Sequence, residues 1–111
     1  MIFSWNRANI LHIAKHAVDQ AEAEEVIRRA SPPWPTKSED GKRLVWGQTI
    51  AGRYLQVIFF YPQDEDVDVE SLSLTDLIAW SDGEDRVVYV IHARDLEDHE
   101  KKQFRKRRRS K

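Results

Sequence analysis

Cysteine is absent from this 111-residue sequence, which excludes disulfide bonds, thiolate metal sites and cysteine nucleophiles. Long apolar runs are also absent, since none approaches the roughly 18 residues that a membrane-spanning helix needs. The first residues lack the apolar core of a signal peptide, because Met1 to Trp5 is followed at once by polar Asn6 and Arg7. We therefore expect a cytoplasmic protein with no membrane segment.

The chain does contain enough apolar residues for one core. They make up 41% of the sequence and include four Trp, four Phe and three Tyr. Charged residues make up 33%, above the roughly 25% of an average globular chain, which predicts a heavily ionised surface. A chain of this length has no room for a second core, so residues 1–111 are predicted to form a single domain.

The net charge of −1 conceals a strong asymmetry. Residues 101–111 hold eight basic residues and no acidic one. The other ten basic residues and all 19 acidic residues lie in residues 1–100, which therefore carry a formal charge of −9. An acidic body with a basic C-terminal tail suggests two surfaces for different partners.

Two helices are predicted in the N-terminal third. Asn6 is a candidate N-cap for a helix that ends near His16. Asp19 and Glu22 have the spacing of a capping box and predict the start of a second helix. Proline cannot donate to a helical ladder, so the proline-rich segment 31–35 is expected to end it.

Three strands and a closing helix are predicted further along the chain, at residues 42–49, 53–61, 86–93 and 96–108. Ala51 and Gly52 form the expected turn of a hairpin between the first two of these strands. Asp95 is a candidate cap for the closing helix.

Residues 62–85 form a long acidic insertion between the last two strands. Five of the seven residues from Asp64 to Glu70 are acidic, and Ser73 is a candidate cap for one short helix. A connection of this length is unusual in a small domain, and we expect it to be either functional or partly mobile.

The predicted order is strand, helix, helix, three-stranded meander and helix, which describes an α+β fold with helices covering a small antiparallel sheet. Short motifs placed on this order resemble the BrnT family of bacterial ribonuclease toxins. The matching residues are Phe3-Ser4-Trp5-Asn6, Asn9, Lys15-His16-Ala17, Asp19 to Ile27, Gly47-Gln48-Thr49, Gly52-Arg53, Ile91-His92-Ala93-Arg94, Glu100 and Phe104. Ala17 departs from the family pattern by replacing a glycine, and His92 departs from it by replacing a hydroxyl residue.

The resemblance implies a RelE-like fold with two N-terminal helices and one C-terminal helix on the sheet. It implies a metal-independent RNA endonuclease that needs no cofactor and inhibits translation as the toxin of a type II toxin–antitoxin pair. The implied partners are the RNA substrate and a cognate DNA-binding antitoxin, through which the toxin could form a homo-oligomer.

Metal-free RNA cleavage needs a base for the 2′-hydroxyl, cations for the charge on the phosphate, and an acid for the leaving oxygen. His92 and Arg94 lie two residues apart on a predicted strand and so share a face, while Arg53 opens a neighbouring strand. We predict that the two arginines hold the phosphate and that His92 transfers a proton. The alternative is that the arginines form structural salt bridges and that His92 is a partly buried polar residue.

Other candidates lie on the predicted helices. Glu100 is a second candidate for proton transfer, or it orients an arginine. Lys15 and His16 are candidate phosphate contacts, or they are cations favoured at the end of a helix. The basic tail, unless it is only a solvated terminus, is predicted to bind RNA phosphates without sequence preference through Lys102, Arg105, Arg107 and Arg108.

His12 and His16 have the i, i+4 spacing of some zinc ligands, and both share a helix face with Asn9. No third ligand accompanies them, so no metal site is expected. Two rival functions remain open: a non-catalytic nucleic-acid-binding protein on the same fold, and a protein-interaction module whose acidic insertion binds a basic partner.

Overall fold

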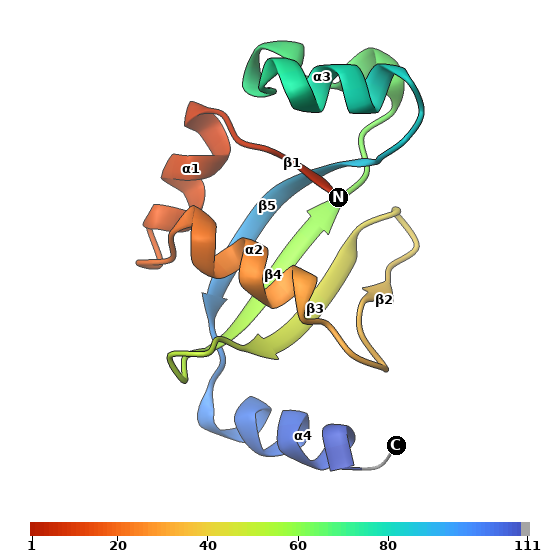
Figure 1. Cartoon of the computed structure of the whole chain (residues 1–111). Helices are drawn as coiled ribbons and strands as arrows, with labels where there is room; N and C mark the ends of the chain where they lie inside the picture. The colour runs from red at the N-terminus through yellow and green to blue at the C-terminus, as the bar shows by residue number, and fades with distance from the viewer. Residues whose placement is uncertain (110–111) are drawn as a thin grey trace.

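One five-stranded sheet organises the molecule, with its strands in the order β1-β5-β4-β3-β2 (Figure 1). The computed structural model describes residues 1–109. The strands are β1 (Ile2–Ser4), β2 (Thr36–Lys37), β3 (Arg43–Gln48), β4 (Tyr54–Phe60) and β5 (Val87–Asp95). The α+β class is as predicted. The expectation of a wholly antiparallel sheet is wrong, because β1 pairs in parallel with β5, the strand farthest from it along the chain.

The helices are α1 (Arg7–Ala14), α2 (Gln20–Arg28), α3 (Leu74–Ser81) and α4 (Asp98–Arg109). Both predicted N-terminal caps are confirmed, since Asn6 and Asp19 each form a reciprocal capping box with the third residue of their helix. The prediction that Asp95 caps the closing helix is wrong, because α4 begins three residues later and Asp95 ends β5. Within residues 1–109, none of the helices has the length and apolar character that crossing a membrane requires.

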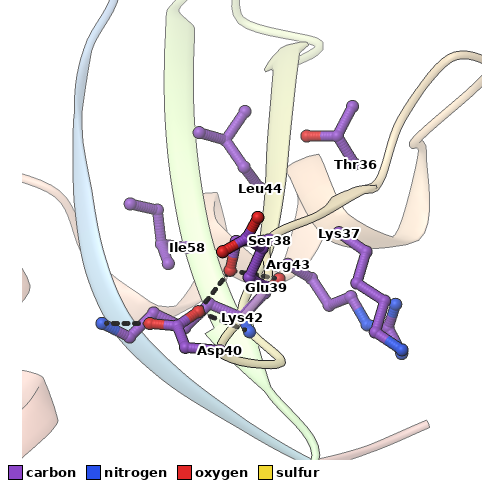
Figure 2. A pocket seen from close by; sticks show the side chains of 9 residues that line it. All are labelled: Thr36, Lys37, Ser38, Glu39, Asp40, Lys42, Arg43, Leu44 and Ile58. Atoms are coloured by element: carbon purple, nitrogen blue, oxygen red, sulfur yellow. Dashed lines mark hydrogen bonds and ion pairs between the residues drawn. The ribbon is translucent and has the colours of Figure 1, made fainter.

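The predicted hairpin is present as β3 and β4, and its turn contains Gly52 at φ +99°, a backbone conformation that favours glycine. The short strand β2 was not predicted. It pairs with β3 across a turn in which the Asp40 carboxylate accepts hydrogen bonds from the Ser38 hydroxyl and the Lys42 backbone N–H (Figure 2). β2 therefore extends the sheet on the side opposite β1.

The two faces of the sheet differ in how they are covered. Val45, Leu55 and Val57 are fully buried on the face against α2, here called the inner face. A Cβ atom on Gly47 would lie only 3.0 Å from Val26 Cγ1 of α2, so helix and sheet pack at this point with no room for a side chain. The alternate residues of β4, such as Gln56, point to the opposite, outer face.

The acidic insertion folds into two short 3-10 helices (Asp64–Asp66 and Val69–Ser71) followed by α3. The predicted cap is confirmed, because the Ser73 hydroxyl accepts a hydrogen bond from the Asp76 backbone N–H. A small second core, formed by Ile2, Val67 and Val87 with Trp80 packed against it, attaches the insertion to the sheet. The insertion therefore packs over the end of the sheet where β1 begins (Figure 1).

Ala17 adopts the left-handed backbone conformation, at φ +57°. Its N–H donates to the Ala14 carbonyl (3.0 Å) and the Val18 N–H donates to the Ile13 carbonyl (3.2 Å), the hydrogen-bond pair of a Schellman motif. This motif ends α1 and turns the chain toward α2. A glycine would adopt the same conformation without a steric cost from Cβ.

Replacing Ala17 by glycine should stabilise the protein by about 0.5–1 kcal/mol. The relief of left-handed strain outweighs the extra freedom that glycine gives the unfolded chain. Urea unfolding followed by circular dichroism measures this change. An unchanged or lower free energy of unfolding would show that Ala17 carries no strain.

Candidate functional site

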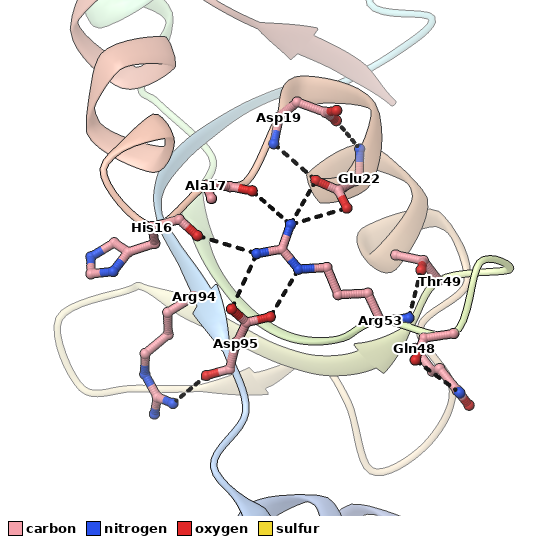
Figure 3. Close-up of polar contacts among 10 residues, drawn as sticks. His16, Ala17, Asp19, Glu22, Gln48, Thr49, Arg53, Arg94 and Asp95 are labelled. Carbon is pink, nitrogen blue, oxygen red and sulfur yellow. Dashed lines mark hydrogen bonds and ion pairs between the residues drawn. The ribbon is translucent and has the colours of Figure 1, made fainter.

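Arg53 lies just before β4 at the centre of a polar network (Figure 3). Its Nε and Nη2 atoms donate to the two carboxylate oxygens of Asp95, at 2.8 and 3.1 Å. Its Nη1 donates to Glu22 (3.0 Å) and to the Ala17 carbonyl (2.6 Å), and Nη2 also donates to the His16 carbonyl (3.2 Å). These bonds use all five N–H groups of the guanidinium, so none is left for a substrate phosphate.

Arg53 and Arg94 lie on opposite faces of the sheet. Asp95 pairs with Leu55 on the inner face, where Arg53 reaches it, whereas Arg94 pairs with Gln56 on the outer face. Figure 3 shows the Arg94 side chain pointing away from the Arg53 network. The prediction that these two arginines converge on one phosphate is therefore wrong, because successive residues of a strand alternate between faces. Arg53 has the structural role that the alternative prediction gave it.

Arg94 is held by Glu100, the third residue of α4. Its two Nη atoms donate to the two Glu100 carboxylate oxygens at 2.7 and 2.9 Å, and further to Gln56 and the Asp95 carbonyl. The bond from Arg94 lowers the pKa of Glu100 to about 2. A carboxylate with so low a pKa is a poor base near neutral pH, so Glu100 orients Arg94. The Arg94 Nε–H has no partner within residues 1–109 and is available to a ligand.

Asn9 anchors α1 along the edge of β5. β1 pairs with only the first three residues of β5, which leaves the rest of that edge without a strand neighbour. The buried Asn9 amide fills part of this gap by donating to the Val90 carbonyl (3.1 Å) and the Ser4 carbonyl (3.0 Å). His12 follows on the same helix face and His16 lies in the turn just after α1, and both reach His92 of β5.

Three imidazoles meet where α1 crosses β5. The His12 Nε2 and His92 Nδ1 atoms are 3.3 Å apart, and the ring centres of His16 and His92 are 5.0 Å apart. His92 pairs with Ile58 on the outer face, two residues from Arg94 on the same strand. We call His12, His16, His92 and Arg94 the histidine cluster. The sequence placed His12 and His16 on one helix face, but it did not indicate that His92 lies opposite them.

The surroundings of His92 lower its pKa. Burial is the main cause, and the positive charges that His16, His12 and Arg94 carry or can acquire add to it. His92 is therefore predominantly neutral at pH 7, with one ring nitrogen free to accept a proton. The rings of His12 and His16 are more exposed than that of His92.

In the part of the chain that the structure describes, the histidine cluster does not have the geometry of a metal site. Within residues 1–109, no group of three or more histidine, aspartate or glutamate side chains has an arrangement that could hold a metal ion. The described side chains of the cluster bring together imidazole groups, which can transfer protons, and a guanidinium group, which carries a positive charge.

The predicted RNA-binding residues are divided between two regions. Lys15 is exposed at the end of α1 next to His16, so it belongs to the surroundings of the histidine cluster. Three arginines of α4 lie over aromatic rings, with Arg105 on Tyr54, Arg107 on Trp46 and Arg108 on Phe104. Lys102 is exposed on the same helix. Residues 110–111 of the predicted basic tail lie outside the described residues.

Comparison with known proteins adds no relative to this picture. No protein-family model matches the chain, and no curated protein or solved structure shows a significant similarity to it.

Replacing Arg53 by glutamine should destabilise the fold by about 2–3 kcal/mol. The change removes charged hydrogen bonds and leaves Glu22 and Asp95 without their cation. Arg28, which forms one exposed i, i+4 ion pair with Glu24, is the matched control, and its replacement by glutamine should cost about 0.5 kcal/mol or less. Urea unfolding of both variants decides the point, and equal losses would contradict the structural role of Arg53.

Proposed function

We propose that the protein is a metal-independent RNA endonuclease that acts at the histidine cluster. The observation that carries this proposal is that the half-buried imidazole of His92, whose pKa is lowered, contacts the exposed imidazoles of His12 and His16. Two residues from His92 on the same strand, Arg94 is held in place by the Glu100 carboxylate. A neutral imidazole, a nearby imidazole that can be protonated and a fixed cation are the groups that cleavage through a 2′-hydroxyl requires.

Each group has a distinct step in this chemistry. The His92 imidazole accepts the proton of the RNA 2′-hydroxyl, and the 2′-oxygen forms a bond to phosphorus. The bond from phosphorus to the 5′-oxygen then breaks, and that oxygen takes a proton from the His16 imidazolium. The products are a 2′,3′-cyclic phosphate and a free 5′-hydroxyl, while the Arg94 Nε–H and the Lys15 ammonium bind the charge that develops on the phosphate oxygens.

His12 has a positioning role in this scheme. A general base at His92 needs the tautomer whose Nδ1–H donates to His12 Nε2, which leaves the His92 Nε2 lone pair free. Glu100 has the corresponding positioning role for Arg94. Its two carboxylate oxygens accept hydrogen bonds from both Nη atoms, which leaves the Nε–H for the phosphate. The candidate catalytic set therefore changes from Arg53, Arg94, His92 and Glu100 to His92, His16 and Arg94.

The BrnT-like motifs support a biological setting for this activity. His16 and Arg94 of the histidine cluster, and the neighbouring Lys15, lie in segments that resemble the family, whereas His92 departs from the family pattern by replacing a hydroxyl residue. We propose a RelE-like toxin of a type II toxin–antitoxin pair, acting on RNA in the cytoplasm and neutralised by a cognate DNA-binding antitoxin. The α+β fold with a helix-covered sheet is compatible with this setting.

The purified protein should cleave a fluorescent RNA oligonucleotide in the presence of EDTA and leave 2′,3′-cyclic phosphate ends. His92→Gln should reduce the rate about a hundredfold or more, because the general base is lost. The matched control is His99→Gln, which changes an exposed histidine of α4 whose Nδ1 lies 3.5 Å from a Glu97 carboxylate oxygen.

Unchanged cleavage by the His92→Gln variant, or full dependence on an added divalent metal, would contradict the proposed mechanism. Absence of cleavage by the unmodified protein, when it still binds RNA, would instead favour the non-catalytic nucleic-acid-binding function.

A second candidate function, protein interaction through the acidic insertion, has its own supporting observation. Leu74 and Ile78 lie one turn apart on α3 and are 74% and 52% exposed. Residues 62–85 surround them with nine acidic residues and no basic one. An apolar stripe in a negative surface fits a basic amphipathic helix of a partner, which buries the stripe and pairs the charges.

A synthetic amphipathic helix of leucine and lysine should bind the protein, with an affinity that falls as salt is added. The Leu74→Asp/Ile78→Asp variant should bind it about tenfold more weakly or worse, as measured by fluorescence anisotropy. Ile50→Asp is the control, because Ile50 is 84% exposed in the turn between β3 and β4. Equal binding by all three proteins would exclude α3 as the docking surface.

A further inference from the structure

A second cationic surface lies at the other end of the inner face, away from the histidine cluster. Phe59 is buried on that face, Arg43 pairs with it across the sheet, and Lys37 pairs with Arg43. Tyr61 lies two residues beyond Phe59 and therefore points to the same inner face. Arg86 lies two residues before the buried Val88 and points to this face as well. Lys37, Arg43, Tyr61 and Arg86 all line one cleft of about 600 Å³.

The pairing of Lys37 with Arg43 is electrostatically unfavourable. Two residues directly opposite each other in an antiparallel ladder bring their side chains close together on one face, and like charges there destabilise the sheet. Figure 2 shows the ends of these two side chains directed to the same side, away from the Asp40 network. Within residues 1–109, neither cation forms an ion pair, although the chain is rich in carboxylates.

The guanidinium of Arg43 has an unsatisfied donor. Its Nε is the one buried side-chain nitrogen or oxygen within the described residues that lacks a hydrogen-bond partner. Such atoms are rare in folded proteins because a buried donor without an acceptor costs free energy. Arg43 thus differs from Arg53, whose five N–H groups all have acceptors.

A second arginine, Arg86, lies over the ring of Tyr61. The Arg86 Cζ is 3.5 Å and the Arg43 Cζ is 5.5 Å from the centre of the Tyr61 ring, and Arg86 also lacks an ion pair within residues 1–109. Asp64 and Asp85 line the cleft too, but Asp85 is neutralised by the Met1 amino group at 2.8 Å. Among the described residues, three cations without an ion pair therefore face one carboxylate without an ion pair.

We propose that this cleft binds a phosphate group, which bridges the guanidinium groups of Arg43 and Arg86 and lies beside the Lys37 ammonium. Phosphate oxygens accept paired hydrogen bonds from a planar guanidinium and relieve the repulsion between Lys37 and Arg43. On binding, the Arg43 side chain turns so that its Nε–H reaches a phosphate oxygen. The binding is independent of the nuclease proposal, since no residue of the histidine cluster takes part.

Titration with inorganic phosphate, adenosine monophosphate and a single-stranded oligodeoxynucleotide tests the proposal, because none of these probes can be cleaved through a 2′-hydroxyl. Two-dimensional NMR should show a saturable shift of the Arg43 Nε–H resonance. Arg43→Gln and Arg86→Gln should each weaken binding about tenfold or more. Arg28→Gln, which removes a guanidinium stacked on Phe3 but paired with Glu24, should leave it unchanged.

The three probes distinguish the source of the phosphate. Tighter binding of the oligodeoxynucleotide, with the same dependence on Arg43, assigns the cleft to a nucleic-acid backbone. Comparable binding of adenosine monophosphate and inorganic phosphate assigns it to small phosphorylated ligands. No saturable shift with any probe, or equal weakening by Arg28→Gln, would overturn the proposal. None of the three titrations measures RNA cleavage. The phosphate-binding result therefore holds whether or not the protein is a nuclease.

Discussion

The position of α1 depends on the guanidinium of Arg53. Its five N–H groups join the start of β4 to the end of β5 through Asp95, to α2 through Glu22, and to the turn after α1 through two backbone carbonyls. Those carbonyls belong to His16 and Ala17, so the left-handed turn presents two acceptors to one cation. By holding this turn, Arg53 sets where α1 ends and therefore where its histidines meet β5.

The alternation of residues along a strand divides the charged groups into two sets. Asp95 points to the inner face and completes the Arg53 network, whereas Arg94 points to the outer face with His92. A shift of one residue in the pairing of β4 with β5 would exchange these roles, because it would move every side chain to the opposite face. The register of this strand pair therefore decides which arginine is structural and which is available for chemistry.

Local features of the sequence predicted local structure well. The caps at Asn6 and Asp19 follow from short side-chain spacings, and both are present. Features that depend on distant segments were missed: β1 pairs in parallel with a strand about 85 residues away in sequence, and His92 meets the α1 histidines over a similar separation. The sequence named His92 as a candidate, but it could not place Arg53, because which face of the sheet Arg53 and Arg94 occupy depends on the pairing of β4 with β5.

Titration of the three imidazoles by NMR tests most directly whether the histidine cluster is a coupled unit. The pKa of His92 should lie below the ordinary value of 6.5, and it should rise when His16 is replaced by glutamine. A His99→Gln control should leave the pKa of His92 unchanged, because His99 lies on α4 beside Glu97. A His92 that titrates at or above 6.5, with no response to the His16 substitution, would contradict electrostatic coupling within the cluster.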